Sequence, residues 1–102
     1  MPVVSVYQFH TILTASAGTV SVNITAGYKE GRQLIIIPET SSNQYDVVLT
    51  DRNGIEVYLF EDATGKWSDV IDYLVTVGNY TLTIRNASID EDFEVLLTMR
   101  ET

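Results

Sequence analysis

The chain has 102 residues, the length of one domain, and 45% of them are hydrophobic, which is enough to form a core without disulfides. Its 14 acidic and 6 basic side chains give a formal net charge of −8, which repels nucleic-acid phosphates and anionic lipids, so we expect neither as a partner. The absence of cysteine excludes disulfides and thiolate metal sites. No signal peptide is recognised, and the longest aliphatic run, Leu34 to Ile37, is too short to span a membrane.

The N-terminal segment combines a strand pattern with an absence of charge. Val3 to Phe9 carries bulky side chains on both alternating faces, and Ile12-Leu13 extends the run. Met1 to Thr14 contains no charged side chain, and an unprotected strand edge of this kind is suited to pairing with another chain. Two interpretations stay open. Residues 1–14 form an arm that adds to a neighbouring subunit, with residues 15–102 as the sandwich domain, or they form an inner strand of that domain.

The next segments alternate with the period of two that is typical of β-strands. After a small-residue turn at Ala15 to Gly18, strict alternation over Thr19 to Ala26 predicts a strand with one wet face. Gly27 to Gly31 is expected to turn the chain. Arg32 to Ile37 is continuously apolar and ends at Pro38, which indicates a strand in a central position.

A β-hairpin is predicted where Tyr45 to Thr50 and Ile55 to Phe60 flank a short polar segment. That segment contains Asn53-Gly54, and this dipeptide favours a type I′ turn because both residues tolerate a positive φ.

The segment after the hairpin is ambiguous. Glu61 to Gly65 reads as a turn. Within Lys66 to Leu74, Ser68 is able to cap a short helix, but acidic residues interrupt the apolar face. We therefore favour a loop followed by a strand over Asp72 to Val77.

Two C-terminal runs complete the pattern. Each places its large apolar side chains on one face: Tyr80, Leu82 and Ile84 in the first, and Phe93, Val95, Leu97 and Met99 in the second. We expect the two runs to pair as an antiparallel ribbon. The whole pattern predicts an all-β fold, a single antiparallel β-sandwich (Ig-like or jelly-roll-like) of about seven or eight strands.

No catalytic constellation is recognisable. The one histidine, His10, lies at a predicted strand end beside Phe9 without a nucleophile partner, and no G-x-S-x-G elbow is present. The carboxylates lie mostly in turns of a domain too small to frame a deep cleft. We therefore expect no enzyme activity, no catalytic residue and no cofactor.

Two acidic groups are the candidates for a metal site. One is Asp90-Glu91-Asp92, and the other comprises Glu61, Asp62, Asp69 and Asp72. Calcium takes oxygen ligands of this kind, but neither group has the EF-hand spacing. Solvated turns are favoured, and no metal residue is assigned; calcium binding would gain support if the two groups met at one end of the sandwich.

Aromatic residues and asparagines offer further candidates for binding. The six tyrosines fit core and interface packing, with a ring in a sugar site as the alternative. Trp67, beside a glycine turn, is predicted to be an exposed binding anchor. Three N-x-[ST] sequences, which begin at Asn23, Asn79 and Asn86, are interpreted as accidental matches to the glycosylation pattern.

Short motifs spread over two thirds of the chain carry a resemblance to a known class of protein. They are Gly31 to Leu34 running to Pro38, Tyr45 to Val47 running into Thr50-Asp51, Gly54 to Tyr58, Gly78 to Thr81, and Asn86 to Ser88 followed by Glu91 to Phe93. In these pieces the chain resembles small β-sandwich structural proteins of tailed-bacteriophage virions. The resemblance implies a non-enzymatic virion component, of the neck (head-to-tail) or capsid-decoration type.

From these observations we expect a structural or assembly protein of a phage particle, assembled in the host cytoplasm. It would bind neighbouring capsid, neck or tail subunits through strand edges and loops, and would form a homo-oligomer in the particle. The alternative is a carbohydrate- or calcium-binding β-sandwich module of a fibre, which would need a groove with an exposed aromatic ring.

Overall fold

The computed structural model describes residues 6–71 and 75–101, and this part of the chain forms an antiparallel β-sandwich. The strands are β1 (Val6–Thr14), β2 (Val20–Pro38), β3 (Gln44–Thr50), β4 (Glu56–Thr64), β5 (Trp67–Val70), β6 (Val75–Arg85) and β7 (Asp92–Glu101). The described residues contain no helix, and hence no helix long and apolar enough to cross a membrane. The predicted all-β sandwich is confirmed.

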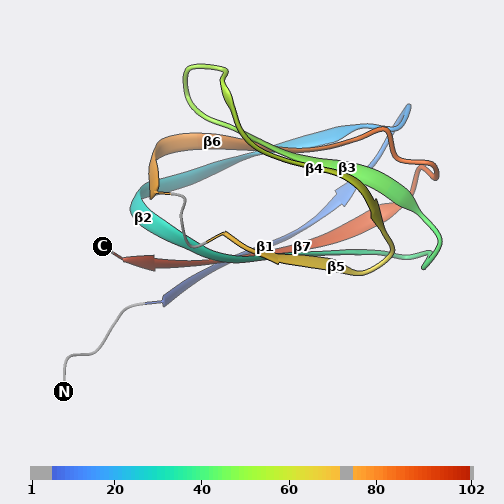
Figure 1. The fold of residues 1–102 in the computed structure, drawn as a ribbon, viewed down its shortest axis with the longest axis horizontal. Helices are drawn as coiled ribbons and strands as arrows, with labels where there is room; N and C mark the ends of the chain where they lie inside the picture. The colour runs from blue at the N-terminus through green and yellow to red at the C-terminus, as the bar shows by residue number, and fades with distance from the viewer. Residues whose placement is uncertain (1–5, 72–74, 102) are drawn as a thin grey trace.

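The long strand β2 belongs to both sheets. Residues 20–30 pair with β6, whereas residues 29–38 pair with β7, and residues 33–36 also pair with β5. The pairing register shifts at Thr25/Gly27 and at Gly31/Gln33, where glycine permits a local bulge. The predicted turn at Gly27 to Gly31 is therefore wrong: the strand continues through these residues and passes from one layer to the other (Figure 1).

The sandwich has two sheets of four strands, because β2 is shared. The lower sheet of Figure 1 has the order β1-β7-β2-β5, and the upper sheet has the order β2-β6-β3-β4. The predicted ribbon of the two C-terminal runs is wrong, since β6 pairs with β2 and β3, and β7 pairs with β1 and β2. Residues 86–91 connect the two sheets instead of closing a hairpin.

The core lies between the two sheets, and the apolar faces predicted for the two C-terminal runs, now β6 and β7, point into it. Its fully buried side chains include Leu34, Ile36, Phe93 and Val95 from the lower sheet and Ile24, Val47, Leu82 and Ile84 from the upper sheet. Tyr45 crosses from β3: its ring meets the ring of Phe93 edge-on at 5.1 Å, and its hydroxyl donates to the Gly65 carbonyl at 2.6 Å. Burial raises the pKa of this phenol above its ordinary range.

The predicted hairpin between β3 and β4 is confirmed, but its turn is not type I′. Gly54 has a φ of 81°, whereas Asn53 has no positive φ. Asp51 and Ile55 close a three-residue loop, in which the Asp51 Oδ1 accepts hydrogen bonds from the Asn53 and Ile55 amides at 2.9 and 3.0 Å. This is a type I turn followed by glycine in the left-handed region.

The strand that follows the hairpin is longer than predicted. β4 continues through the expected turn as far as Thr64, with Asp62 at a φ of 60°. Both interpretations of the next residues are wrong at residues 67–70, which form neither a loop nor a helix but β5. Of the strand predicted over Asp72 to Val77, residues 75–77 are confirmed as the beginning of β6, and residues 72–74 lie outside the described residues.

Candidate interaction surfaces

The acidic segment Asp90 to Asp92 holds loops at one end of the sandwich. The Asp90 carboxylate accepts the amide hydrogens of Ala17 and Gly18 at 3.0 and 2.8 Å. These two residues have positive φ values of 53° and 79°, so the carboxylate supports a turn that alanine adopts only with strain. Thr14 donates to the Asp92 carboxylate at 2.5 Å. The segment therefore acts as a set of acceptors for the β1–β2 turn.

Glu91 ties the same segment to the loop between β2 and β3. Its carboxylate accepts from the Thr40 hydroxyl at 2.6 Å, the Thr40 amide at 2.7 Å and the Asn43 side chain at 3.1 Å. These hydrogen bonds, that of the Thr40 hydroxyl first, hold the pKa of Glu91 below its ordinary value. Asn43 is completely buried and also bonds to Ser88 and Ile89, so one network joins the two loops.

The second acidic group is spread out rather than gathered into a site. Asp69 accepts a hydrogen bond from the Tyr58 hydroxyl at 2.5 Å, which links β5 to β4 across the sandwich. The Asp62 amide donates to the Asp46 carboxylate at 2.9 Å. Asp72 lies outside the described residues, and among those described no group of three acidic or histidine side chains is placed to hold a metal ion.

Trp67 is not the exposed anchor that its position beside a glycine turn predicted. It is only 9% exposed, and its ring packs against the rings of Phe60 at 5.1 Å and Tyr58 at 6.4 Å. β5 is an edge strand whose alternation turns Trp67 and Asp69 inward and Val70 outward. The tryptophan therefore closes the core between β4 and β5.

His10 lies in the middle of β1, on the outer face of the lower sheet. Its Nε2 lies 2.9 Å from the Glu94 Oε2 on β7, and both side chains are about half exposed. No serine, threonine or cysteine hydroxyl or thiol bonds to it among the described residues. The contact is a cross-strand pair on the sheet surface.

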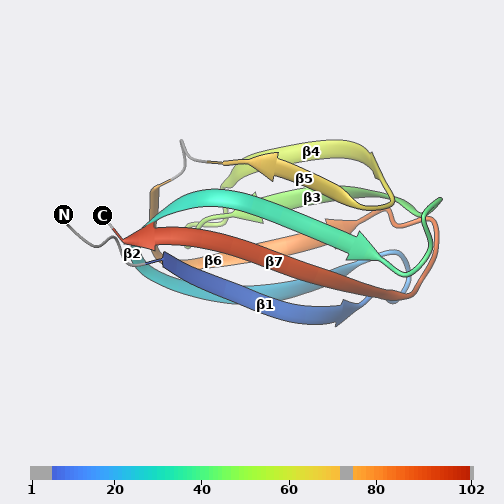
Figure 2. The ribbon, with the colours of Figure 1, turned by 90° about the horizontal axis from the view of Figure 1, so that it is seen from below.

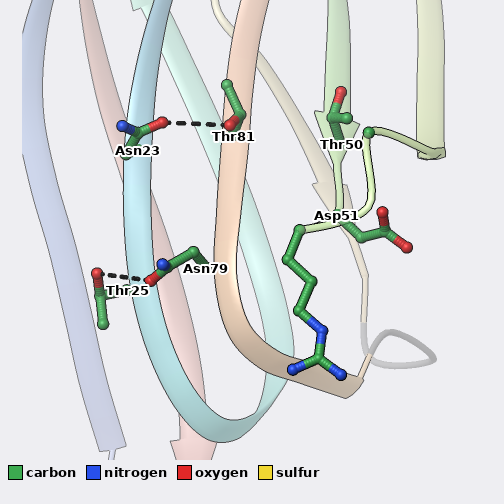
Figure 3. Close-up of a pocket in the computed structure, with 8 residues that line it drawn as sticks. Asn23, Thr25, Thr50, Asp51, Asn79 and Thr81 are labelled. Carbon is green, nitrogen blue, oxygen red and sulfur yellow. Dashed lines mark hydrogen bonds between the residues drawn. The ribbon is translucent and has the colours of Figure 1, made fainter.

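A polar groove lies on the upper sheet beside the β3–β4 hairpin, with a cavity volume of about 530 Å³. Two of the N-x-T sequences meet there, because β2 and β6 place Asn23 opposite Thr81 and Thr25 opposite Asn79. Each threonine donates to the facing asparagine Oδ1, at 3.2 and 3.1 Å (Figure 3). Within the described part of the chain, neither asparagine Nδ2 makes a hydrogen bond, so two amide groups remain available as donors.

The sequence contained a signal for this groove that was interpreted as accidental. Two N-x-T sequences on antiparallel strands form reciprocal Asn–Thr pairs when their central residues, here Ile24 and Tyr80, lie opposite each other. Predicting the groove from the two N-x-T sequences requires knowing that β2 pairs with β6, and the alternation of residues within each strand does not show this pairing. The remaining lining residues are Thr50, Asp51, Arg52 and Gly54 of the hairpin.

One side of the sandwich is free of formal charge. All 20 charged side chains of the chain lie at or beyond Lys29, so residues 1–28 contain no aspartate, glutamate, lysine or arginine. β1 is the edge of the lower sheet, and the first half of β2 is the edge of the upper sheet. Both run along the lower side of Figure 2. We call β1 together with residues 20–25 of β2 the charge-free side.

The opposite side of the sandwich, formed by β4 and β5, is acidic. It carries Glu56, Glu61, Asp62 and Asp69 against Lys66. The charges are thus distributed unevenly across the strands, and the uncharged segment is longer than the stretch Met1 to Thr14 on which the sequence prediction rests. The absence of charge up to residue 28 matters because β1 and the first half of β2 form the two sheet edges on the same side of the sandwich.

No protein-family model matches the chain, and no curated protein matches it in sequence. Solved structures with similar architecture include the NLP core of Drosophila, described with pentamer formation and histone binding (15% identity, TM-score 0.47, 91% of this chain and 95% of that one). A carbohydrate-binding module, CBM36, in complex with calcium and xylotriose is similar at 16% identity and a TM-score of 0.41, covering 93% of this chain and 88% of that one.

The structure of infectious bursal disease virus, Gt strain, contains a third similar chain, at 12% identity and a TM-score of 0.45. The match covers 96% of this chain but only 32% of that one. At these identities the likeness concerns the β-sandwich fold alone, and none of the three assigns a partner or ligand to this protein.

Proposed function

We propose that the protein is a non-enzymatic structural component of a tailed-phage virion, which binds neighbouring subunits through its charge-free side. The observation that supports this proposal is that two sheet edges, β1 and the first half of β2, have no strand beside them among residues 6–71 and 75–101, in a chain of net charge −8. Proteins normally protect exposed strand edges with charge, proline or bulges, because such edges pair with other chains. An edge that lacks charge over residues 6–25 is suited to a permanent neighbour.

The acidic side chains are consistent with a structural role. Asp90, Glu91 and Asp92 are engaged in hydrogen bonds to backbone and side-chain donors of neighbouring loops, which fix the end of the sandwich. A rigid domain with fixed loops presents its edges in one geometry, which an assembly contact requires. This is the role that the resemblance to small phage sandwich proteins implies.

The composition of purified particles tests the proposal. Quantitative mass spectrometry of virions of the phage that encodes the chain should find it at a constant ratio to the major capsid protein after density-gradient purification. A chain that is abundant in the infected host cytoplasm but absent from purified particles would refute the virion role.

A carbohydrate-binding module of a fibre is the second candidate, because the polar groove offers two asparagine Nδ2 groups that have no hydrogen-bond partner among the described residues, although its lining includes no aromatic ring. Amide and hydroxyl groups of this kind bind sugar hydroxyls. Backbone NMR spectra recorded during titration with a panel of neutral oligosaccharides should show shifts centred on Asn23 and Asn79 if this candidate is correct. Asn79→Ala should remove these shifts, whereas Asn53→Ala, outside the groove lining, should not.

A further inference from the structure

We propose that the charge-free side binds a second copy of this chain, with β1 antiparallel to β1 of the partner. The inference rests on the proposed function in that it names the neighbour occupying this side. It concerns the isolated chain in solution, however, so it is tested without the particle.

The distribution of charge selects this side for self-association. Two chains of net charge −8 repel each other, and contact through β4 would bring Glu61 and Asp62 towards their own copies, whereas Glu56 is paired with Arg85 at 3.0 Å. Contact through the charge-free side leaves these acids at the far side of each molecule. The two sides are separated along the shortest dimension of the molecule, 19 Å, which exceeds two Debye lengths of about 8 Å at physiological salt. Repulsion between the acidic sides is therefore screened.

The topology allows one symmetry axis to satisfy both open edges. A two-fold axis perpendicular to the sheets places β1 beside the partner's β1, and the first half of β2 beside its counterpart, in both cases antiparallel. β1 has 9 residues, which give roughly 30 Å of edge at about 3.3 Å per residue. Such an isologous contact is the commonest symmetry of protein oligomers. The lower sheet would then continue through both subunits.

The exposed side chains of β1 fit this contact. The outward residues Gln8, His10, Ile12 and Thr14 include no aspartate, glutamate, lysine or arginine, and Ile12 is 59% exposed. Ile12 borders a depression of about 290 Å³ with Ile37 and Pro38, and Glu39, Asp92 and Glu94 on neighbouring segments complete its lining. An axis through the middle residue of β1, His10, places Ile12 beside the partner's Gln8 and each His10 beside its own copy.

A matched pair of lysine variants tests the inference by sedimentation velocity. Ile12 and Val70 are 59% and 58% exposed and lie on opposite edge strands of the same sheet. Ile12→Lys puts a charge on the proposed edge, and it retains the fold because the new ammonium faces Glu94 on β7. Wild type and Val70→Lys should sediment as dimers, whereas Ile12→Lys should dimerise at least about tenfold more weakly.

Cross-linking gives a second test, which benefits from the absence of cysteine in the chain. Facing residues of antiparallel strands have Cα atoms about 4.5–5.5 Å apart, within disulfide range. Oxidised His10→Cys should therefore form a covalent dimer, and Val70→Cys should not.

The outcomes separate this inference from the proposed function. A wild-type chain that stays monomeric at millimolar concentration, or a dimer that Val70→Lys disrupts and Ile12→Lys preserves, overturns the inference. A monomeric chain that is nevertheless found in purified particles overturns the inference alone. A dimer that is absent from particles overturns the virion role alone.

Discussion

Replacement of Asn43 by alanine should destabilise the fold more than any exposed asparagine replacement, because one buried side chain joins two loops. Its Nδ2 donates to the Ile89 carbonyl at 3.0 Å and to Glu91 at 3.1 Å. Its Oδ1 accepts from the Ser88 hydroxyl at 3.1 Å and from the Ile89 amide at 3.2 Å. Asn43→Ala removes all of these bonds and leaves their partners beside a methyl group.

The expected loss in the free energy of unfolding is about 2–4 kcal/mol. A hydrogen bond contributes about 0.5–1.5 kcal/mol net, and water replaces part of the loss because Ser88 and Ile89 are exposed. For a domain of this size, such a loss lowers the melting temperature by roughly 8 °C or more. Urea unfolding followed by circular dichroism measures the change. Asn53→Ala, in the exposed hairpin loop, is the control and should change stability by less than about 0.5 kcal/mol. A loss below about 1 kcal/mol in Asn43→Ala would show that this side chain does not hold the two loops together.

Three further predictions follow from the turns and carboxylates. Gly54→Val should cost more than about 1 kcal/mol, because Gly54 has a φ of 81° that a β-branched residue adopts only with strain; an unchanged melting temperature would contradict the hairpin geometry. Hydrogen bonds lower the pKa of Glu91 in the folded state, so its stabilisation is present above the ordinary value of 4.5 and is lost as pH falls through the lower folded value. The decline of stability from pH 5 downwards should therefore be less steep in Glu91→Gln, and equal slopes would argue against this role. Calcium in millimolar excess should leave the melting temperature unchanged. A ligand at 100 times its dissociation constant stabilises the folded state by about 2.7 kcal/mol, which this measurement would detect. A rise of several degrees would therefore show that the acidic segments bind the ion.

The alternation of apolar residues predicted which faces are buried, but not which strands are neighbours. Leu82 and Ile84 on β6, like Phe93 and Val95 on β7, point into the core as the period of two requires. The assumption that neighbouring runs pair failed because the chain between them crosses from one sheet to the other. The alternation of residues along a strand shows which face is buried and which is exposed, whereas the choice of the neighbouring strand depends on the rest of the chain.

Glycine was the second source of error. Gly27 and Gly31 were interpreted as the ends of a turn, yet they allow β2 to bulge and continue from one sheet into the other. The position of Trp67 beside a glycine turn favours exposure, whereas its environment is set by Tyr58 and Phe60 on another strand. The link between Glu91 and Thr40 was likewise beyond local reasoning, since 51 positions separate these residues.

Hydrogen–deuterium exchange of the isolated chain at low and high concentration tests most directly the claim that the charge-free side is the interface. We expect that raising the concentration slows amide exchange in residues 6–14 of β1 and 20–25 of β2, whose outer edges have no partner strand among the described residues of the single chain. Exchange in β4 and β5, the acidic edges, should stay unchanged. Protection that develops in β4 and β5 while β1 continues to exchange freely would place the interface on the acidic side instead.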